Sequence, residues 1–236
     1  MHAVPSLDDA VAANLDDERI HGAEPMPNRR GQAPSQECRN SQKPLAALPM
    51  NRDCADMARQ LRDKAAGLFH VYTHSVWAAE LFRNDRDCGV FLRELARAVD
   101  KAAWTCVGFC LMRTHYHLVL DVDDDALPFG MHALNFRYAV EFNRRHGSKG
   151  HVLGARYDSV RIEDERHLLS AYRYMARNPV EAGSCEAAED WRWSSFAAAI
   201  GAAESIAFVD PDIVVGCFNG PREIAAAGLR AFVAES

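Results

Sequence analysis

The sequence lacks the patterns that several common classes of protein require. Its seven cysteines are odd in number, scattered and never paired as CxxC, which argues against a disulfide framework and a cysteine zinc site. No run approaches the ~18 apolar residues of a transmembrane helix, and the N-terminus lacks the basic-then-apolar order of a signal peptide. Glycine-rich phosphate loops, the HExxH zinc motif and the serine elbow are also absent from the sequence. We therefore expect a cytoplasmic protein with reduced thiols.

The composition changes along the chain and predicts three segments. Residues 1–56 are rich in Pro, Asn, Asp, Gln and Ser and keep no apolar period for long, so we expect a disordered or variable extension there. The patterned part over residues 57–199 is long enough for one domain with a sizeable core. Residues 200–236 end in "PREIAAAGLRAFVAE", which predicts a helical C-terminal tail.

The formal net charge of -6 hides a local basic excess. Residues 137–177 hold nine Lys and Arg residues against five acidic residues. Such an excess attracts phosphate groups, and a solvated helix surface explains it equally well.

The periodicity of the apolar residues predicts an alternation of strands and helices over residues 57–199. Alternating or continuous apolar runs predict strands at 68–75, 104–112, 115–122 and 156–163. Helical spacing predicts helices at 86–102, 127–147 and 164–178, the last with Asp164 as N-cap and Pro179 as its stop. The order β-α-β-β-α-β-α predicts an α+β protein with a ferredoxin-like antiparallel sheet and helices on one face.

Two histidines lie one residue apart in the strand "HYHLVLDV". Alternate residues of a strand point the same way and sit roughly 6.5 to 7 Å apart, so His115 and His117 share one face while Tyr116 points to the other. Two imidazoles at this spacing can converge on one cation. An HxH pair on its own is a weak signal, because strands often carry half-exposed histidines, so a metal site needs a third ligand.

The helix predicted over residues 164–178 offers that ligand. Tyr174 and Asn178 are four residues apart and therefore share one helix face. If this face lies over the histidine strand, Asn178 brings a carbonyl oxygen to the ion and Tyr174 a phenol beside it. Tyr172 is a rival for the phenol, but two residues along a helix are a rotation of ~200°, so only one of the two tyrosines can face the site.

Four motifs occur in an order that resembles a known family. The segments "CLMRTHYHLVLDV", "FNRRHG", "ARYDSVRIEDERHLLSAYRYMARNPVEAG" and "WRWSSF" resemble the successive motifs of the IS200-like single-tyrosine (Y1) transposases, in particular the REP-associated tyrosine transposases of bacteria. These are HUH enzymes, named for two histidines that flank a hydrophobic residue. The resemblance covers residues 57–196, and Tyr116 fills the hydrophobic position.

The resemblance implies a site and an activity. His115 and His117 match the HUH ligands of a Mg²⁺ or Mn²⁺ ion, Asn178 matches the third ligand and Tyr174 the nucleophile. The implied reaction is a DNA strand transfer that cleaves and rejoins single-stranded DNA, as in a REP-type hairpin, through a 5′-phosphotyrosine intermediate. The arginines that we expect to contact the DNA backbone are Arg144, Arg145 and Arg156. A homodimer is possible, and the sequence does not decide between a monomer and a dimer.

Two other functions compete with this interpretation. A ferredoxin-like domain can bind RNA or DNA hairpins without cleaving them, although the open sheet face of such a domain usually displays stacked aromatic rings rather than histidines. A domesticated transposase that binds but no longer cleaves belongs to the same class. A structural zinc protein is less favoured, because two imidazoles and an amide lack the thiolates that such sites prefer.

Overall fold

The computed structural model describes residues 66–76, 79–123, 126–154 and 156–235. The extension predicted over residues 1–56 and the first residues of the predicted domain lie outside this part. In chain order the elements are β1 (Gly67–His74), α2 (Asp85–Ala102), β2 (Thr105–Met112), β3 (His115–Val122), α3 (Ala126–His146), β4 (Asp158–Arg161), α4 (Glu165–Glu181), η2 (Ala188–Asp190), α5 (Phe196–Ala199), α6 (Asp212–Val215) and α7 (Arg222–Ala234).

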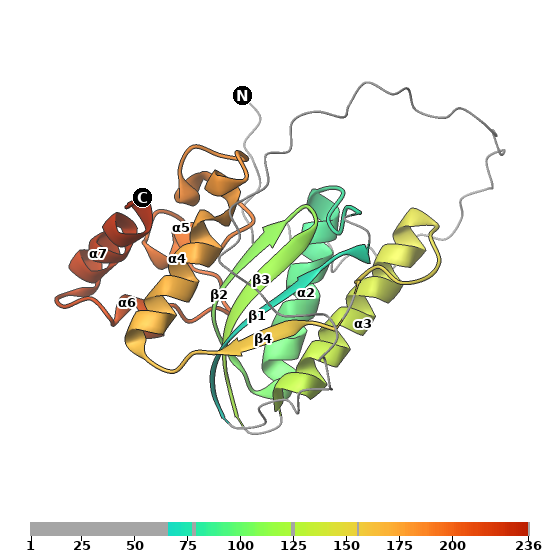
Figure 1. The fold of residues 1–236 in the computed structure, drawn as a ribbon, viewed down its shortest axis with the longest axis horizontal. Coiled ribbons are helices and arrows are strands. Elements are labelled where there is room, and N and C mark those ends of the chain that lie inside the picture. Colours follow the sequence, from blue (N-terminus) through green and yellow to red (C-terminus); the bar gives the residue numbers. More distant parts are fainter. Residues whose placement is uncertain (1–65, 77–78, 124–125, 155, 236) are drawn as a thin grey trace, which may run out of the picture. The chain divides into compact units, whose positions relative to one another are not determined.

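The four strands form one antiparallel sheet in the order β2-β3-β1-β4 (Figure 1). Only Arg113 and Thr114 separate β2 from β3, so these strands form a tight hairpin in which Met112 pairs with His115. Helix α2 connects β1 to β2 and α3 connects β3 to β4, which is the β-α-β-β-α-β connection of ferredoxin-like folds. The predicted α+β class and ferredoxin-like sheet are confirmed.

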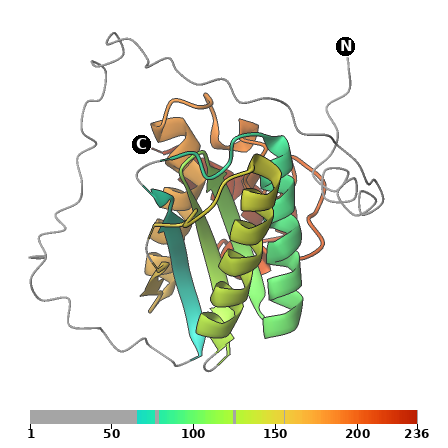
Figure 2. The ribbon, with the colours of Figure 1, turned by 90° about the vertical axis from the view of Figure 1, so that its right-hand side faces the viewer.

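The helices cover both faces of the sheet, which corrects the expectation that they lie on one face. Helices α2 and α3 pack over one face (Figure 2). Helix α4 packs over the other face, mainly on β2. Strand β2 has apolar side chains on both of its faces, and α4 buries those on the second face. The buried side chains that face α2 and α3 include Phe69, Val71, Phe109, Tyr116 and Leu118, and those that share a core with α4 include Val107, Cys110 and Val119.

Helix α4 begins as predicted and ends later than predicted. Asp164 is its N-cap, and the carboxylate accepts a hydrogen bond from the backbone N–H of His167 at 2.7 Å. Pro179 does not stop the helix, which runs on to Glu181. A proline removes one backbone donor, and here the next turn still closes because Ala182 N–H donates to the carbonyl of Asn178 at 3.0 Å. Asn178 therefore lies inside the last helical turns.

The C-terminal elements pack against α4 and against the edge of the sheet. The segment at Trp191 to Phe196 runs along the outer edge of β2, where Leu111 N–H donates to the carbonyl of Trp193 at 2.9 Å. Helix α7 lies beside α4, and the Arg177 guanidinium donates to the carbonyl of Val233 at 3.1 Å (Figure 1). Within the described part of the chain, no helix is both long enough and apolar enough to cross a bilayer.

Gly108 sets how closely α4 approaches the sheet. A Cβ at this position would lie 2.8 Å from Cε2 of Tyr172 and 2.9 Å from Cε of Met175, both on α4. Such distances are well inside van der Waals contact, so only glycine allows α4 its present position.

The Gly108→Ala variant should therefore be less stable, by about 1–3 kcal/mol, because its methyl group overpacks the contact between β2 and α4. The shift of α4 should also change the NMR resonances of the His117 ring, which contacts α4 through Asn178. Urea unfolding followed by circular dichroism measures the stability change. An unfolding midpoint equal to that of the wild type would show that the contact does not constrain α4.

Candidate functional site

The structure brings three of the predicted residues into direct contact. The side-chain amide of Asn178 lies between the two imidazoles, with its Oδ1 3.0 Å from Nε2 of His115 and its Nδ2 3.3 Å from Nε2 of His117. Residues 115 and 117 come from β3 and residue 178 from α4, so the docking of the helix on the sheet creates the cluster. The Nε2 atoms of both histidines therefore point toward the same amide.

Each imidazole is also held at its other nitrogen. Nδ1 of His115 lies 3.1 Å from Oγ1 of Thr114, and Nδ1 of His117 lies 3.1 Å from Nε2 of His70. A partner at Nδ1 fixes the orientation of a histidine ring. In the hydrogen-bonded arrangement, Nε2 of His115 donates to Oδ1 of Asn178, while Nε2 of His117 accepts from Nδ2. A bound cation would require the His115 proton to lie on Nδ1, where Thr114 Oγ1 can accept it, so that both Nε2 lone pairs are directed to one point.

Burial keeps these rings neutral. His117 is 3% exposed and His70 is 8% exposed. Burial lowers the pKa of His70 to about 4, and it lowers the pKa of His117 well below its ordinary value of 6.5, with the neighbouring His70 adding to the effect. Burial also lowers the pKa of His115, against a smaller opposite effect of the Asn178 hydrogen bond. Neutral imidazoles at neutral pH keep the lone pairs that a cation needs.

The two candidate tyrosines occupy opposite environments. Tyr174 is 47% exposed, and its ring lies edge-on to His117 with the ring centroids 5.5 Å apart. Tyr172 is fully buried against Gly108, in the core between α4 and β2. Of these two tyrosines, only Tyr174 is therefore accessible to a large substrate while it lies beside the histidines.

The three arginines differ in their partners. Arg145 is 12% exposed and its guanidinium binds the buried carboxylate of Asp87 at 2.5 Å, which ties α3 to α2. This ion pair gives Arg145 a structural role, and its contact with DNA stays a prediction. Arg144 is exposed and bonds to Glu141, and Arg156 is exposed just before β4.

The sequence prediction missed the residues that β1 contributes to the site. His70, Tyr72 and His74 alternate on the face that carries the histidine pair, with Tyr72 opposite His117 and His74 opposite His115. The ring centroids of His74 and His115 are 5.0 Å apart. The signal that could have revealed them is the alternation of ring side chains in "HVYTH", within a strand that was itself predicted.

The donor atoms present suit a divalent cation. Within the described residues, no three side chains of His, Cys, Asp and Glu are grouped to hold a metal ion. A site here therefore needs the amide oxygen of Asn178 as third donor. Two neutral imidazole nitrogens and one amide oxygen form a donor set that Mn²⁺ accepts, whereas Mg²⁺ prefers an all-oxygen shell.

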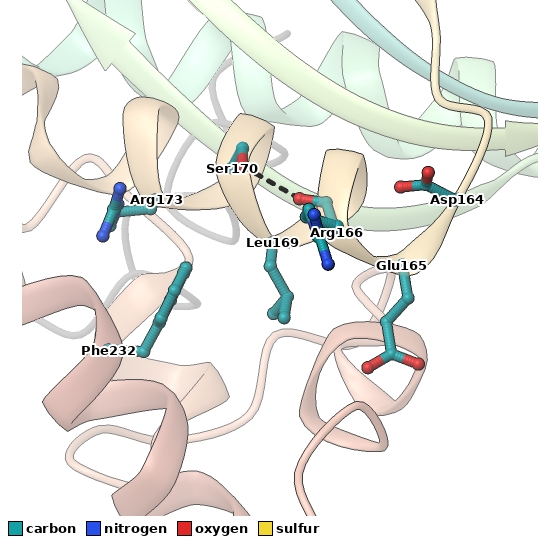
Figure 3. A pocket seen from close by; sticks show the side chains of 7 residues that line it. All are labelled: Asp164, Glu165, Arg166, Leu169, Ser170, Arg173 and Phe232. Carbon is teal, nitrogen blue, oxygen red and sulfur yellow. Dashed lines mark hydrogen bonds between the residues drawn. The ribbon is translucent and has the colours of Figure 1, made fainter.

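A separate hollow of about 560 Å³ lies on the side of α4 that faces α7 (Figure 3). Arg166 and Arg173 reach it from α4 and Phe232 from α7, and the Arg173 guanidinium lies 4.7 Å from the centre of the Phe232 ring. The acidic side chains of Asp164 and Glu165 offset the two arginines at this hollow. None of the histidine-site residues lines it.

Acidification should destabilise the folded protein through the buried imidazoles. Because the folded-state pKa of His70, about 4, lies below its ordinary value of 6.5, the unfolded chain binds the proton first as the pH falls. The stability contributed by the neutral ring is complete above pH 6.5 and is lost as the pH falls toward 4, by roughly 3 kcal/mol for His70 alone. Urea unfolding at about pH 7 and about pH 5 measures this loss. His70→Gln should narrow the difference between the two pH values, and an unchanged difference would contradict the assignment.

Comparison with known proteins supports the fold. No protein-family model matches the sequence, and no curated protein matches it. Among solved structures, a REP-associated tyrosine transposase bound to a REP hairpin is similar, with a TM-score of 0.53 and 13% sequence identity. The similarity covers 70% of this chain and 93% of that chain. The chain therefore shares the fold of a tyrosine transposase.

Proposed function

We propose that this protein is a metal-dependent, single-tyrosine DNA nuclease and strand transferase of the transposase type. The observation that carries the proposal is the convergence of the His115 and His117 Nε2 atoms on Asn178, with the exposed ring of Tyr174 beside His117. The shared fold with a transposase that was solved on a REP hairpin supports the same assignment. It also points to a DNA hairpin with single-stranded flanks as the substrate.

The ligands of the ion would be His115, His117 and Asn178. When bound, a divalent ion such as Mn²⁺ supplies charge stabilisation to the scissile phosphate, which otherwise repels a nucleophile. Thr114 and His70 hold the imidazoles in orientation, so little reorganisation is needed on binding. Helix α4 carries both the amide ligand and Tyr174, and it therefore keeps the nucleophile at a fixed distance from the ligands.

The phenol of Tyr174 would attack the phosphorus of a phosphodiester in line. A bond forms between the phenolic oxygen and phosphorus, and the bond from phosphorus to the 3′-oxygen breaks. The phenol loses its proton, and the departing 3′-oxygen gains one and leaves as a 3′-hydroxyl. One phosphodiester replaces another, so the reverse attack by the same or another 3′-hydroxyl rejoins DNA without ATP. Tyr174 is 47% exposed, so its phenol is accessible from solvent for this attack.

Exposed arginines would make part of the contact with the DNA backbone. Arg144 and Arg156 are the more exposed candidates, whereas Arg145 is already paired with Asp87 and is only 12% exposed. Their contribution would be independent of sequence and would weaken as salt rises.

A covalent-adduct assay tests the function. The full chain is incubated with Mn²⁺ and a labelled pool of single-stranded oligonucleotides, each with a REP-type hairpin and randomised flanks, and is then denatured and separated on a gel. We expect a labelled protein band that EDTA abolishes. Tyr174→Phe should remove the band, because the phenolic oxygen forms the bond.

Tyr172→Phe is the matched control, since it removes the same atom from the neighbouring buried tyrosine and should leave the band in place. An adduct that persists in Tyr174→Phe would refute the nucleophile assignment. If wild-type protein binds hairpins in a gel-shift assay and never forms an adduct, the protein is a hairpin-binding module and the proposed catalysis is wrong.

A further inference from the structure

Helix α3 is apolar on two opposite sides. Its inner side packs into the core with buried residues that include Leu134, Tyr138 and Phe142. Its outer side exposes Phe129 to 67% and Phe136 to 62%. A helix that covers one core normally carries polar residues on its opposite side, so a second apolar side indicates a second contact.

The outer apolar residues form a narrow stripe. Phe129, Ala133, Phe136 and Val140 are separated by four, three and four residues. At 100° per residue they fall within an arc of about 60°. Val140 is itself 52% exposed. Six large hydrophobic side chains are exposed in the described part of the chain, and three of them belong to this stripe: Phe129, Phe136 and Val140. The other three are Val160, Tyr174 and Ile224.

The four residues of this α3 stripe have the same spacing when counted from either end of the helix. If a second α3 lies antiparallel to the first, Phe129 of each copy is opposite Val140 of the other, and Ala133 is opposite Phe136. Each small residue then faces a large one, which is the complementarity that a symmetric helix pair needs. We propose that the outer face of α3 is the contact between two copies of this chain, paired as antiparallel helices about a two-fold axis.

The chemistry of the stripe favours a second copy over DNA. Ala133 and Val140 have no ring on which a base can stack. The two phenylalanines are separated by seven residues, or roughly 10.5 Å along the helix, whereas successive stacked bases are about 3.4 Å apart. A self-complementary row of aromatic and aliphatic side chains matches a helix interface better than a stacking platform.

The size of the stripe predicts a weak dimer. The exposed parts of the two phenylalanines and Val140 amount to roughly 350 Å² for each copy, against about 800 Å² for each partner in a standard interface. We therefore expect a dissociation constant in the micromolar range. Because α3 lies on the sheet face away from α4, the pairing would leave the histidine sites of both copies uncovered (Figure 2).

Sedimentation velocity of the full chain at concentrations from roughly 1 to 100 μM tests this contact. The weight-average sedimentation coefficient of the wild type should rise with concentration toward that of a dimer. Phe129→Glu and Phe136→Glu should each weaken the association at least tenfold, because each substitution places two charges in the symmetric contact. Both positions are exposed, so folding should be unchanged by circular dichroism.

The matched control is Ile224→Glu, which alters an apolar residue that is 62% exposed on α7 and should associate as the wild type does. Equal loss of association in Ile224→Glu, or a wild type that stays monomeric throughout, would overturn the proposal. A monomeric wild type whose hairpin binding is weakened by Phe136→Glu would assign the stripe to DNA instead. The outcome is independent of the adduct assay, so either proposal can fail alone.

Discussion

The candidate site depends on the docking of α4 against β2. The histidines belong to the sheet, while Asn178 and Tyr174 belong to the helix, so neither element contains the site by itself. The absence of a side chain at Gly108 lets Tyr172 and Met175 pack directly on the strand. The fully buried Tyr172 packs α4 against the sheet. Because Tyr174 is two residues further along the helix, it then points outward, beside His117.

The sheet face beneath α4 contains buried polar side chains, whose loss of hydration costs free energy that an apolar core does not lose. Buried imidazoles lose hydration, and His70 and His117 are both nearly inaccessible to solvent. Their mutual hydrogen bond and the Asn178 amide offset part of this loss. Polar groups that break the apolar pattern of a sheet are expected where function requires them. The opposite face, under α2 and α3, follows the ordinary pattern and supplies the larger core.

Much of the fold and part of the site could be predicted from local patterns. The alternation in "THYH" placed both histidines on one face, and the four-residue spacing placed Tyr174 with Asn178, because both inferences need only the geometry of one element. The role of His70 and the environment of Arg145 could not be predicted, because their partners lie 47 and 58 residues away in the chain. The continuation of α4 through Pro179 depends on carbonyl partners that only the folded turn provides.

We propose that His115, His117 and Asn178 form one metal site beside Tyr174. The most direct test is an X-ray structure of the protein crystallised with Mn²⁺, using data collected at the manganese absorption edge. We expect an anomalous peak within coordination distance of Nε2 of both histidines and of Oδ1 of Asn178. A peak elsewhere in the protein, with the Asn178 amide still bonded to both imidazoles, would contradict it.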